Sequence, residues 1–209
     1  MLVRVNARSG EDQLLDIDAI RGLGLAAVML PKSETAADVE ATSAATGRPV
    51  VALIESARGL GAARPIAAVC ARIAFGSIDF AADMGSAHTR AALASAGSEL
   101  VLASRLAGRA APIDGVTTSI KDPDLIRADA AHASELGFSG KLLIHPAQIA
   151  PALDGFRPSE DDVAWAERIL AARGADGAAA IDGAMVDAPV FLRAEQIVWR
   201  AARFRAPAG

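Results

Sequence analysis

The sequence has little cysteine, few aromatic side chains and no excess of basic residues. One of its 209 residues is cysteine, none is tyrosine, and aromatic residues make up 4%. A single cysteine excludes an internal disulfide and is typical of a reducing compartment. The formal net charge of −4 provides no basic face of the kind that binds nucleic acid. No apolar run approaches the roughly 20 residues that a membrane span needs.

What the sequence does contain is enough apolar residues for one sizeable core. Hydrophobic residues make up 52% of the chain, which excludes a disordered protein. A length of 209 residues suits one domain of ordinary size. The first residues, 1–4, do not have the pattern of a signal peptide. Together these features predict a cytoplasmic protein that binds neither nucleic acid nor membranes.

Short strand-like runs alternate with helical patterns along most of the chain. The first four runs begin 22 to 24 residues apart, which is the repeat expected of successive βα units. This alternation predicts a parallel sheet with right-handed crossovers. Six runs are fewer than the eight strands of a closed barrel, so the pattern alone favours an open sheet. The six runs are Leu2–Asn6, Ala26–Leu30, Val50–Glu55, Arg72–Phe75, Gly115–Thr118 and Lys141–His145.

The last part of the chain has a different pattern. Residues 158–173 are expected to form a capped helix, residues 174–183 a linker rich in glycine, alanine and aspartate, and residues 190–204 a last amphipathic helix. We therefore predict two parts. Residues 1–155 form the β/α part, and residues 156–209 form a helical extension packed on it or on a neighbouring subunit.

Two carboxylates each close one of the apolar runs. Glu55 follows the run 50–54, and Asp79 follows the run 73–78. In a parallel α/β architecture the carboxyl ends of the strands face the active site, so two acids delivered there form an oxygen site for Mg²⁺. Each acid could instead cap the helix that follows it. Two acids in matching positions of successive units favour the metal site.

A resemblance to a known family rests on six segments that match in order over nearly the whole chain. They are VRVN (3–6), MLPK (29–32), ALIESARG (52–59), FGSIDFAADMG (75–85), GFSGKLLIHPAQI (137–149) and GAMVDAPV (183–190). Each segment is weak alone, but the set is specific. Together they resemble the citrate lyase β-subunit-like family of CoA-ester lyases.

The resemblance implies a (β/α)₈ barrel of the TIM and phosphoenolpyruvate-binding type, with a C-terminal helical extension. Members of that family make or break a carbon–carbon bond between an acyl-CoA and a small oxo acid, use Mg²⁺ and commonly form trimers. This chain matches strands three to eight, and the family's first two βα units, which help to hold CoA, have no counterpart in it. A misassigned start codon, a truncated protein or a partner chain that supplies these strands would each explain this difference.

The resemblance also implies roles for individual residues. Glu55 and Asp79 match the metal ligands, and Arg4 matches the arginine that grips the oxo-acid carboxylate through a fork-shaped pair. Asp187 matches an aspartate that handles a proton in a neighbouring subunit's active site, although it could also cap a helix. Backbone amides around Gly76 and Ser77 are expected to contact the same substrate oxygens, because glycine lets the chain approach closely.

For the other polar residues, a structural role or simple exposure to solvent is the favoured interpretation. Lys32 and His145 each end a strand-like run, where a solvated lysine and a structural histidine hydrogen bond are the favoured interpretations. His88 and His132 are expected to be solvated in helical regions. No cluster of histidine and cysteine in the sequence suggests zinc.

Three functions compete. The leading hypothesis is an Mg²⁺-dependent lyase that cleaves or forms a β-hydroxyacyl-CoA of the malyl-CoA, citramalyl-CoA or citryl-CoA type by retro-aldol chemistry, as a homotrimer. The second is a class II pyruvate-type aldolase without CoA, which usually lacks the long C-terminal extension that carries Asp187. The third is a non-catalytic subunit that depends on a partner.

Overall fold

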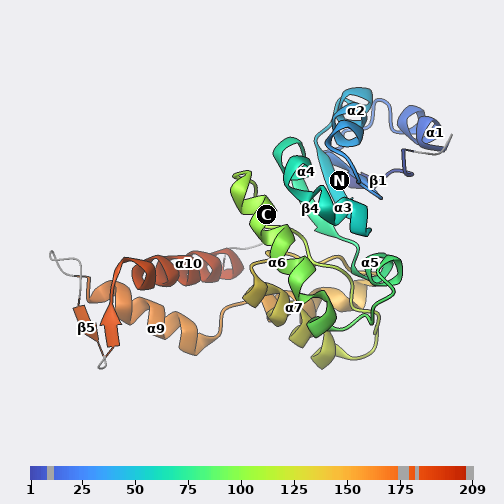
Figure 1. The fold of residues 1–209 in the computed structure, drawn as a ribbon. Coiled ribbons are helices and arrows are strands. Elements are labelled where there is room, and N and C mark those ends of the chain that lie inside the picture. Colours follow the sequence, from blue (N-terminus) through green and yellow to red (C-terminus); the bar gives the residue numbers. More distant parts are fainter. Residues whose placement is uncertain (9–11, 174–178, 182–183, 206–209) are drawn as a thin grey trace.

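A parallel sheet forms the first half of the chain in the computed structural model, which describes residues 1–8, 12–173, 179–181 and 184–205 (Figure 1). Its strands follow one another in the order in which they occur in the sequence, and each pairs in parallel with the next. The parallel pairing is the one predicted from the repeat of βα units. The strands are β1 (Leu2–Arg4), β2 (Ala27–Leu30), β3 (Val50–Ile54) and β4 (Arg72–Phe75).

Helices connect these strands and cover one face of the sheet (Figure 1). Four of them begin at a side-chain cap: Thr35, Ser56, Thr89 and Asp122 each accept a hydrogen bond from the backbone N–H three residues further on. Such a cap contributes about 1 kcal/mol. The helices are α1 (Asp12–Ala19), α2 (Ala36–Thr46), α3 (Ala57–Gly61), α4 (Ala63–Val69), α5 (Ser77–Asp83), α6 (Arg90–Leu106), α7 (Pro123–Leu136), the 3₁₀ turn η1 (Pro146–Gln148) and α8 (Ile149–Phe156).

The sheet is buried on both faces. All five residues of β3 are buried, as expected of a central parallel strand. Ala52 and Ile54 belong to the core between the sheet and the helices, which also holds the single cysteine, Cys70. Val51 and Leu53 belong to a second cluster on the opposite face. Side chains from beyond the four strands complete that second cluster, namely Ile113 and Leu142.

Two of the six predicted strands do not form. The runs 115–118 and 141–145 contain no strand, and the chain near them makes only single bridges that extend the sheet past β4 in parallel. The prediction of six strands is therefore wrong for these two runs, and the eight-stranded barrel remains a prediction. The two bridges pair Ala74 with Ile113 and Asp114 with Lys141.

The buried side chain of Gln148 explains why these two runs do not form regular hydrogen-bonded strands. Gln148 is fully buried, and its Nε2 donates to the carbonyls of Thr117 (2.8 Å) and Ser119 (2.9 Å). Its Oε1 accepts from the backbone N–H of Ile144 at 2.8 Å. Backbone groups that a strand would use are thus satisfied by one side chain, and this allows the two segments to leave the sheet.

The C-terminal part forms an arm that extends from the body (Figure 1). It consists of α9 (Glu160–Ala171), β5 (Ala179–Ile181), β6 (Ala184–Val186) and α10 (Ala188–Arg205). The predicted helix after Pro158 is α9, capped by Ser159. The linker prediction is wrong at residues 179–181, which pair antiparallel with β6, while 174–178 and 182–183 lie outside the described residues.

The arm has a core of its own. Apolar residues of α9 such as Val163 and Ile169 pack against Phe191 and Ile197 of α10, apart from the core of the body. One hydrogen bond to the body runs from Arg200 Nη1 to Ser134 Oγ on α7 (2.9 Å). The division at residues 155 and 156 remains a prediction.

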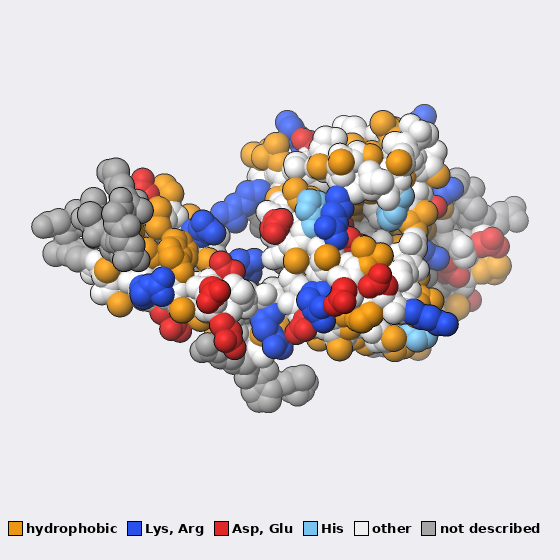
Figure 2. All heavy atoms as spheres, turned by 90° about the horizontal axis from the view of Figure 1, so that it is seen from below, with side chains coloured by type: hydrophobic (Ala, Val, Ile, Leu, Met, Phe, Trp, Pro, Cys, Tyr) orange, Lys and Arg blue, Asp and Glu red, His pale blue; other side chains and the backbone are white. Residues whose placement is uncertain are grey.

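The distribution of surface charge and the apolar character of the helices both follow from the composition of the sequence. On the face in Figure 2, acidic and basic side chains are interspersed over the body and the arm. Within the described ranges, none of the helices combines the length and the apolar character that crossing a membrane requires.

Candidate active site at the carboxyl ends of the strands

The structure brings the two predicted acids together. Glu55 directly follows β3, and Asp79 lies in the first turn of α5, just after β4. The two strands pair in parallel up to Ile54 and Phe75, so they end side by side. Glu55 is 6% exposed and Asp79 is exposed, and their carboxylates are close enough to share a hydrogen bond when one is protonated.

The electrostatics of this pair suit a cation. Burial raises the pKa of Glu55 above its ordinary value, and the carboxylate of Asp79 raises it further, against the lowering effects of the Lys32 amide and the Arg4 charge. A divalent cation between the two acids would relieve their repulsion. Mg²⁺ is held in proteins by one or two carboxylates, with water and substrate oxygens in the remaining positions. The pair fits this ion, although no cluster of three or more histidine, cysteine and acidic residues occurs among the described residues.

The two oxygens of Glu55 have different surroundings. Oε1 accepts a hydrogen bond from the backbone N–H of Lys32 at 2.8 Å. Oε2 lies against Gly76, where an added Cβ would be 2.8 Å from Oε2 and 2.5 Å from the Cβ of Glu55. Only glycine leaves room for the glutamate at this position. Gly76 leads into α5, the helix whose first turn carries Asp79.

The hydrogen bonds of Gly76 and Ser77 limit which of their groups could make the predicted contacts with substrate oxygens. The Gly76 N–H donates to the carbonyl of Ile54 at 2.8 Å, so this amide is already engaged by the backbone. The Ser77 side chain is buried and points elsewhere. Its Oγ packs against Gly115 and lies 3.0 Å from His88 Nε2. His88 is exposed, as predicted, but it lies in the loop between α5 and α6, so the prediction that it lies in a helical region is wrong.

Arg4 and Asp187 are placed very differently. Arg4 ends β1, is exposed, and its charge acts on Glu55. Asp187 is exposed between β6 and α10. The hairpin that β6 forms with β5 lies at the outer end of the arm (Figure 1). Within one chain it does not join the acid pair. A role for Asp187 at this site therefore requires a second copy of the chain.

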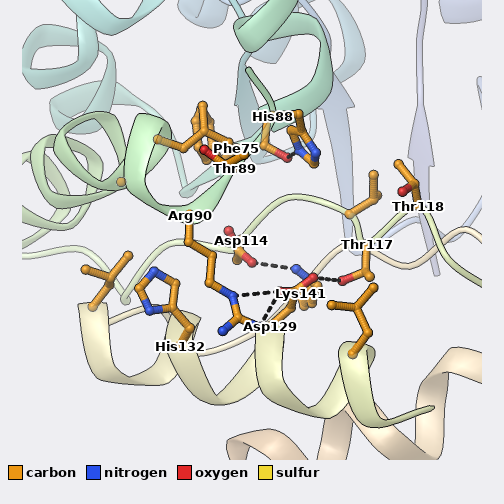
Figure 3. Close-up of a pocket in the computed structure, with 16 residues that line it drawn as sticks. Phe75, His88, Thr89, Arg90, Asp114, Thr117, Thr118, Asp129, His132 and Lys141 are labelled. Atoms are coloured by element: carbon orange, nitrogen blue, oxygen red, sulfur yellow. Dashed lines mark hydrogen bonds and ion pairs between the residues drawn. The ribbon is translucent and has the colours of Figure 1, made fainter. Parts of the chain in front are cut away.

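A pocket of about 310 Å³ adjoins the site behind Ser77, between α6, α7 and the segment 114–118 (Figure 3). Its charged groups are paired with one another. Lys141 Nζ lies 2.6 Å from Asp114 Oδ2, and Arg90 Nε donates to Asp129 Oδ1 at 2.9 Å. Although burial opposes it, hydrogen bonds from Arg90 and Thr117 bring the pKa of Asp129 below its ordinary value.

The buried pair in this pocket supports a stability prediction. The side chain of Lys141 is 4% exposed and that of Asp114 19%. Replacing Lys141 by Met leaves the carboxylate without its partner, so we expect the free energy of unfolding to fall by about 2 kcal/mol. Urea unfolding measures this change. Lys121→Met, at an exposed position, is the matched control and is expected to have no effect. Equal stabilities of the two variants would contradict the prediction.

Sequence reasoning missed two groups near the site. The Lys32 amide that binds Glu55 depends on a left-handed backbone (φ 47°), for which lysine gives no sequence signal. The contact between His88 and Ser77 spans 11 residues and depends on a turn at Gly85 (φ 63°). In the sequence, Gly85 was the only available signal that the helix carrying Asp79 ends after a few residues.

A parallel βα fold with two acids at the carboxyl ends of adjacent strands defines a class of enzyme that binds a divalent cation where its strands end. Comparison with known proteins narrows this class. The HpcH/HpaI aldolase/citrate lyase family matches residues 1–146, and the chain belongs to this family.

Characterised relatives agree with this assignment. The citrate lyase subunit beta-like protein of Mycobacterium tuberculosis is 38% identical over 96% of this chain and 76% of its own length. The (3S)-malyl-CoA thioesterase of Cereibacter sphaeroides is 35% identical over 98% of this chain and 76% of its own length. The chain thus spans about three quarters of these relatives, and the predicted resemblance to CoA-ester lyases is confirmed.

Solved structures show the same similarity. CitE from Mycobacterium tuberculosis, in complex with magnesium, acetoacetate and coenzyme A, superimposes with a TM-score of 0.87 at 36% identity, over 96% of this chain and 78% of that one. A second structure of that protein, with magnesium and pyruvate, gives a TM-score of 0.76 at 30% identity, over 94% of this chain and 74% of that one. These structures agree with the predicted Mg²⁺ cofactor.

Proposed function

We propose that this protein is an Mg²⁺-dependent carbon–carbon lyase that cleaves or forms a β-hydroxyacyl-CoA of the malyl-CoA, citramalyl-CoA or citryl-CoA type. The observation that carries the proposal is the pair of Glu55 and Asp79, one buried and one exposed, at the ends of adjacent strands. The magnesium, oxo acid and coenzyme A bound to CitE support the same chemistry.

In the proposed site Glu55 and Asp79 hold Mg²⁺, which supplies a Lewis acid when bound. Arg4 holds the carboxylate of the oxo acid through a charge-assisted pair, because its charge already reaches Glu55. The Ser77 amide, in the first turn of α5, is a backbone donor for a substrate oxygen. Together these groups fix the orientation of the oxo acid at the strand ends.

Cleavage is a retro-aldol step. A base removes the proton of the β-hydroxyl group, a carbonyl forms on that carbon, and the adjacent carbon–carbon bond breaks. The electron pair of that bond becomes the enolate of the acyl thioester, which then takes up a proton. We assign the proton transfer to Asp187 of a second copy within a trimer, since Asp187 of the same chain lies on the arm, between β6 and α10.

Two measurements test the proposal. Calorimetry of the 209-residue chain with Mg²⁺, in the presence of oxaloacetate or glyoxylate, measures whether the cation site forms. A panel of malyl-CoA, citramalyl-CoA and citryl-CoA then measures cleavage with and without Mg²⁺. We expect Mg²⁺-dependent release of the acyl-CoA from one of these thioesters.

The other outcomes separate the alternatives. Cleavage of a free 4-hydroxy-2-oxo acid without any thioester would identify a class II aldolase instead. Mg²⁺ binding without turnover of either substrate class would identify a subunit that needs a partner chain. A folded chain that binds no Mg²⁺ would contradict the proposed function at its first step.

A further inference from the structure

We propose that Lys32 is a positioning residue for the cation site, because its backbone N–H holds one oxygen of Glu55 and so orients the other oxygen for a cation. The inference rests on the proposed function, since it concerns the same pair of acids. It extends that function to the choice of ion. A site that offers one oxygen from Glu55 favours Mg²⁺ over Ca²⁺.

The backbone of Lys32 has an unusual conformation. Among the described residues other than glycine, Lys32 alone has a positive φ, at 47°. The left-handed region is unfavourable for residues with a Cβ. Such residues persist when their surroundings hold them in place, and they concentrate at functional sites. Two things therefore need an explanation: which contacts hold Lys32 in this conformation, and what the conformation does at the site.

The cause lies in the next residue, Ser33, which is completely buried. Its N–H donates to the carbonyl of Leu53 at 3.1 Å, and its Oγ donates to the carbonyl of Leu30 at 2.9 Å. The carbonyl oxygen of Ser33 lies so close to Gly59 that a Cβ there would be 2.7 Å from it. These contacts fix the chain after β2 from both sides and determine the turn at Lys32.

The consequence is the contact with Glu55. The turn directs the Lys32 N–H at Glu55 Oε1, with a nitrogen–oxygen distance of 2.8 Å. Oε2 remains, and it packs against Gly76, the residue that leads into α5. The side chain of Lys32 is exposed, and the amide is the group of this residue that lowers the pKa of Glu55. The backbone, and not the ammonium group, is therefore the part of Lys32 that acts.

A carboxylate held in this way suits one kind of cation. Mg²⁺ accepts single oxygens from one or two carboxylates in a strict octahedral arrangement and keeps water or substrate in the other positions. Ca²⁺ takes more oxygens and often binds both oxygens of one carboxylate. With Oε1 held by an amide, binding of Ca²⁺ through both oxygens of Glu55 would compete with that hydrogen bond.

The test removes the N–H and leaves the side chain in place. In an ester variant at residue 32, the backbone N–H is replaced by oxygen through incorporation of the α-hydroxy analogue of lysine. Calorimetry with Mg²⁺ and with Ca²⁺ then gives both affinities. We expect Mg²⁺ to bind about tenfold more weakly, as on loss of a group that orients a metal ligand, with a smaller change for Ca²⁺. Thermal unfolding of the same samples shows that they are folded.

Three further samples make the result decisive. Lys32→Gly and Lys32→Ala keep the N–H and remove the side chain, so we expect wild-type Mg²⁺ affinity from both. An ester at Lys121, an exposed lysine outside the helices and strands, is the matched control for the chemistry and should change nothing. A residue that merely stabilised the fold would not change the ratio of the Mg²⁺ and Ca²⁺ affinities.

The inference is overturned if the ester at residue 32 leaves both affinities unchanged. It is also overturned if Lys32→Gly weakens Mg²⁺ binding as much as the ester does, because the side chain would then be the active part. A wild-type chain that binds no Mg²⁺ overturns the proposed function itself and this inference with it. Wild-type binding with an unaffected ester variant overturns the inference alone.

Discussion

Replacing Glu55 by Gln is expected to weaken Mg²⁺ binding on the order of a hundredfold or more and to remove turnover. Glutamine has nearly the same shape as glutamate. Its carbonyl oxygen can keep the hydrogen bond from the Lys32 N–H at the position of Oε1. The amide nitrogen then takes the place of Oε2, next to Gly76, where it is a donor and cannot bind a cation. Calorimetry with Mg²⁺ and oxaloacetate measures the loss, and Asp79→Asn should act in the same direction.

Glu34 provides the matched control for this variant. It is an acid beside the site, but its carboxylate accepts from Ser56 Oγ at 2.8 Å and lies 3.7 Å from Arg58. Glu34→Gln removes one negative charge near the strand ends without touching the pair of acids. We expect it to change Mg²⁺ affinity little. Full Mg²⁺ binding by both Glu55→Gln and Asp79→Asn would show that the cation site lies elsewhere.

Replacing Asp187 by Ala is expected to lower turnover to about a hundredth of wild type or less, as on loss of a general acid or base. Mg²⁺ affinity should not change, because Asp187 lies on the arm and the acids lie in the body. If Asp187 acts on a second copy, two inactive chains can complement each other. Co-production of Asp187→Ala with Glu55→Gln under two purification tags should yield an active mixed assembly, in which one chain supplies the acids and the other the aspartate.

Each variant alone is the first control for complementation, and each should stay inactive after the same purification. Asp161→Ala removes an exposed acid from the first turn of α9, also on the arm, and should leave turnover unchanged. An inactive mixed assembly would contradict the assignment of Asp187 to a neighbouring copy. An active Asp187→Ala variant would remove Asp187 from the mechanism altogether.

The acid pair was predictable because it depends on regular structure. Two apolar runs of strand length, each closed by an acid, place Glu55 and Asp79 at one edge of any parallel sheet. The start of α7 was predictable for a similar reason, since Asp122 followed by a proline is a local signal. Features of this kind can be predicted from local sequence patterns together with the rule that successive βα units lie side by side.

The missed features depend on contacts that no local pattern encodes. The amide of Lys32 reaches Glu55 only because Ser33 is held by both Leu30 and Leu53. The runs 115–118 and 141–145 have the composition of strands, yet the side chain of Gln148 takes their backbone groups. The strand at 179–181 was missed because small residues around it suggested a linker, although Asp182 and Gly183 next to it are a strong hairpin signal.

The arm has an evolutionary consequence. Its apolar residues pack on one another, with Val163 and Ile169 against Phe191 and Ile197, apart from the core that supports the strand ends. Substitutions that alter the arm's outer surface therefore leave Glu55 and Asp79 undisturbed. Selection can act on the surface of the arm while the residues at the strand ends stay unchanged. The two parts of this chain can thus diverge at different rates.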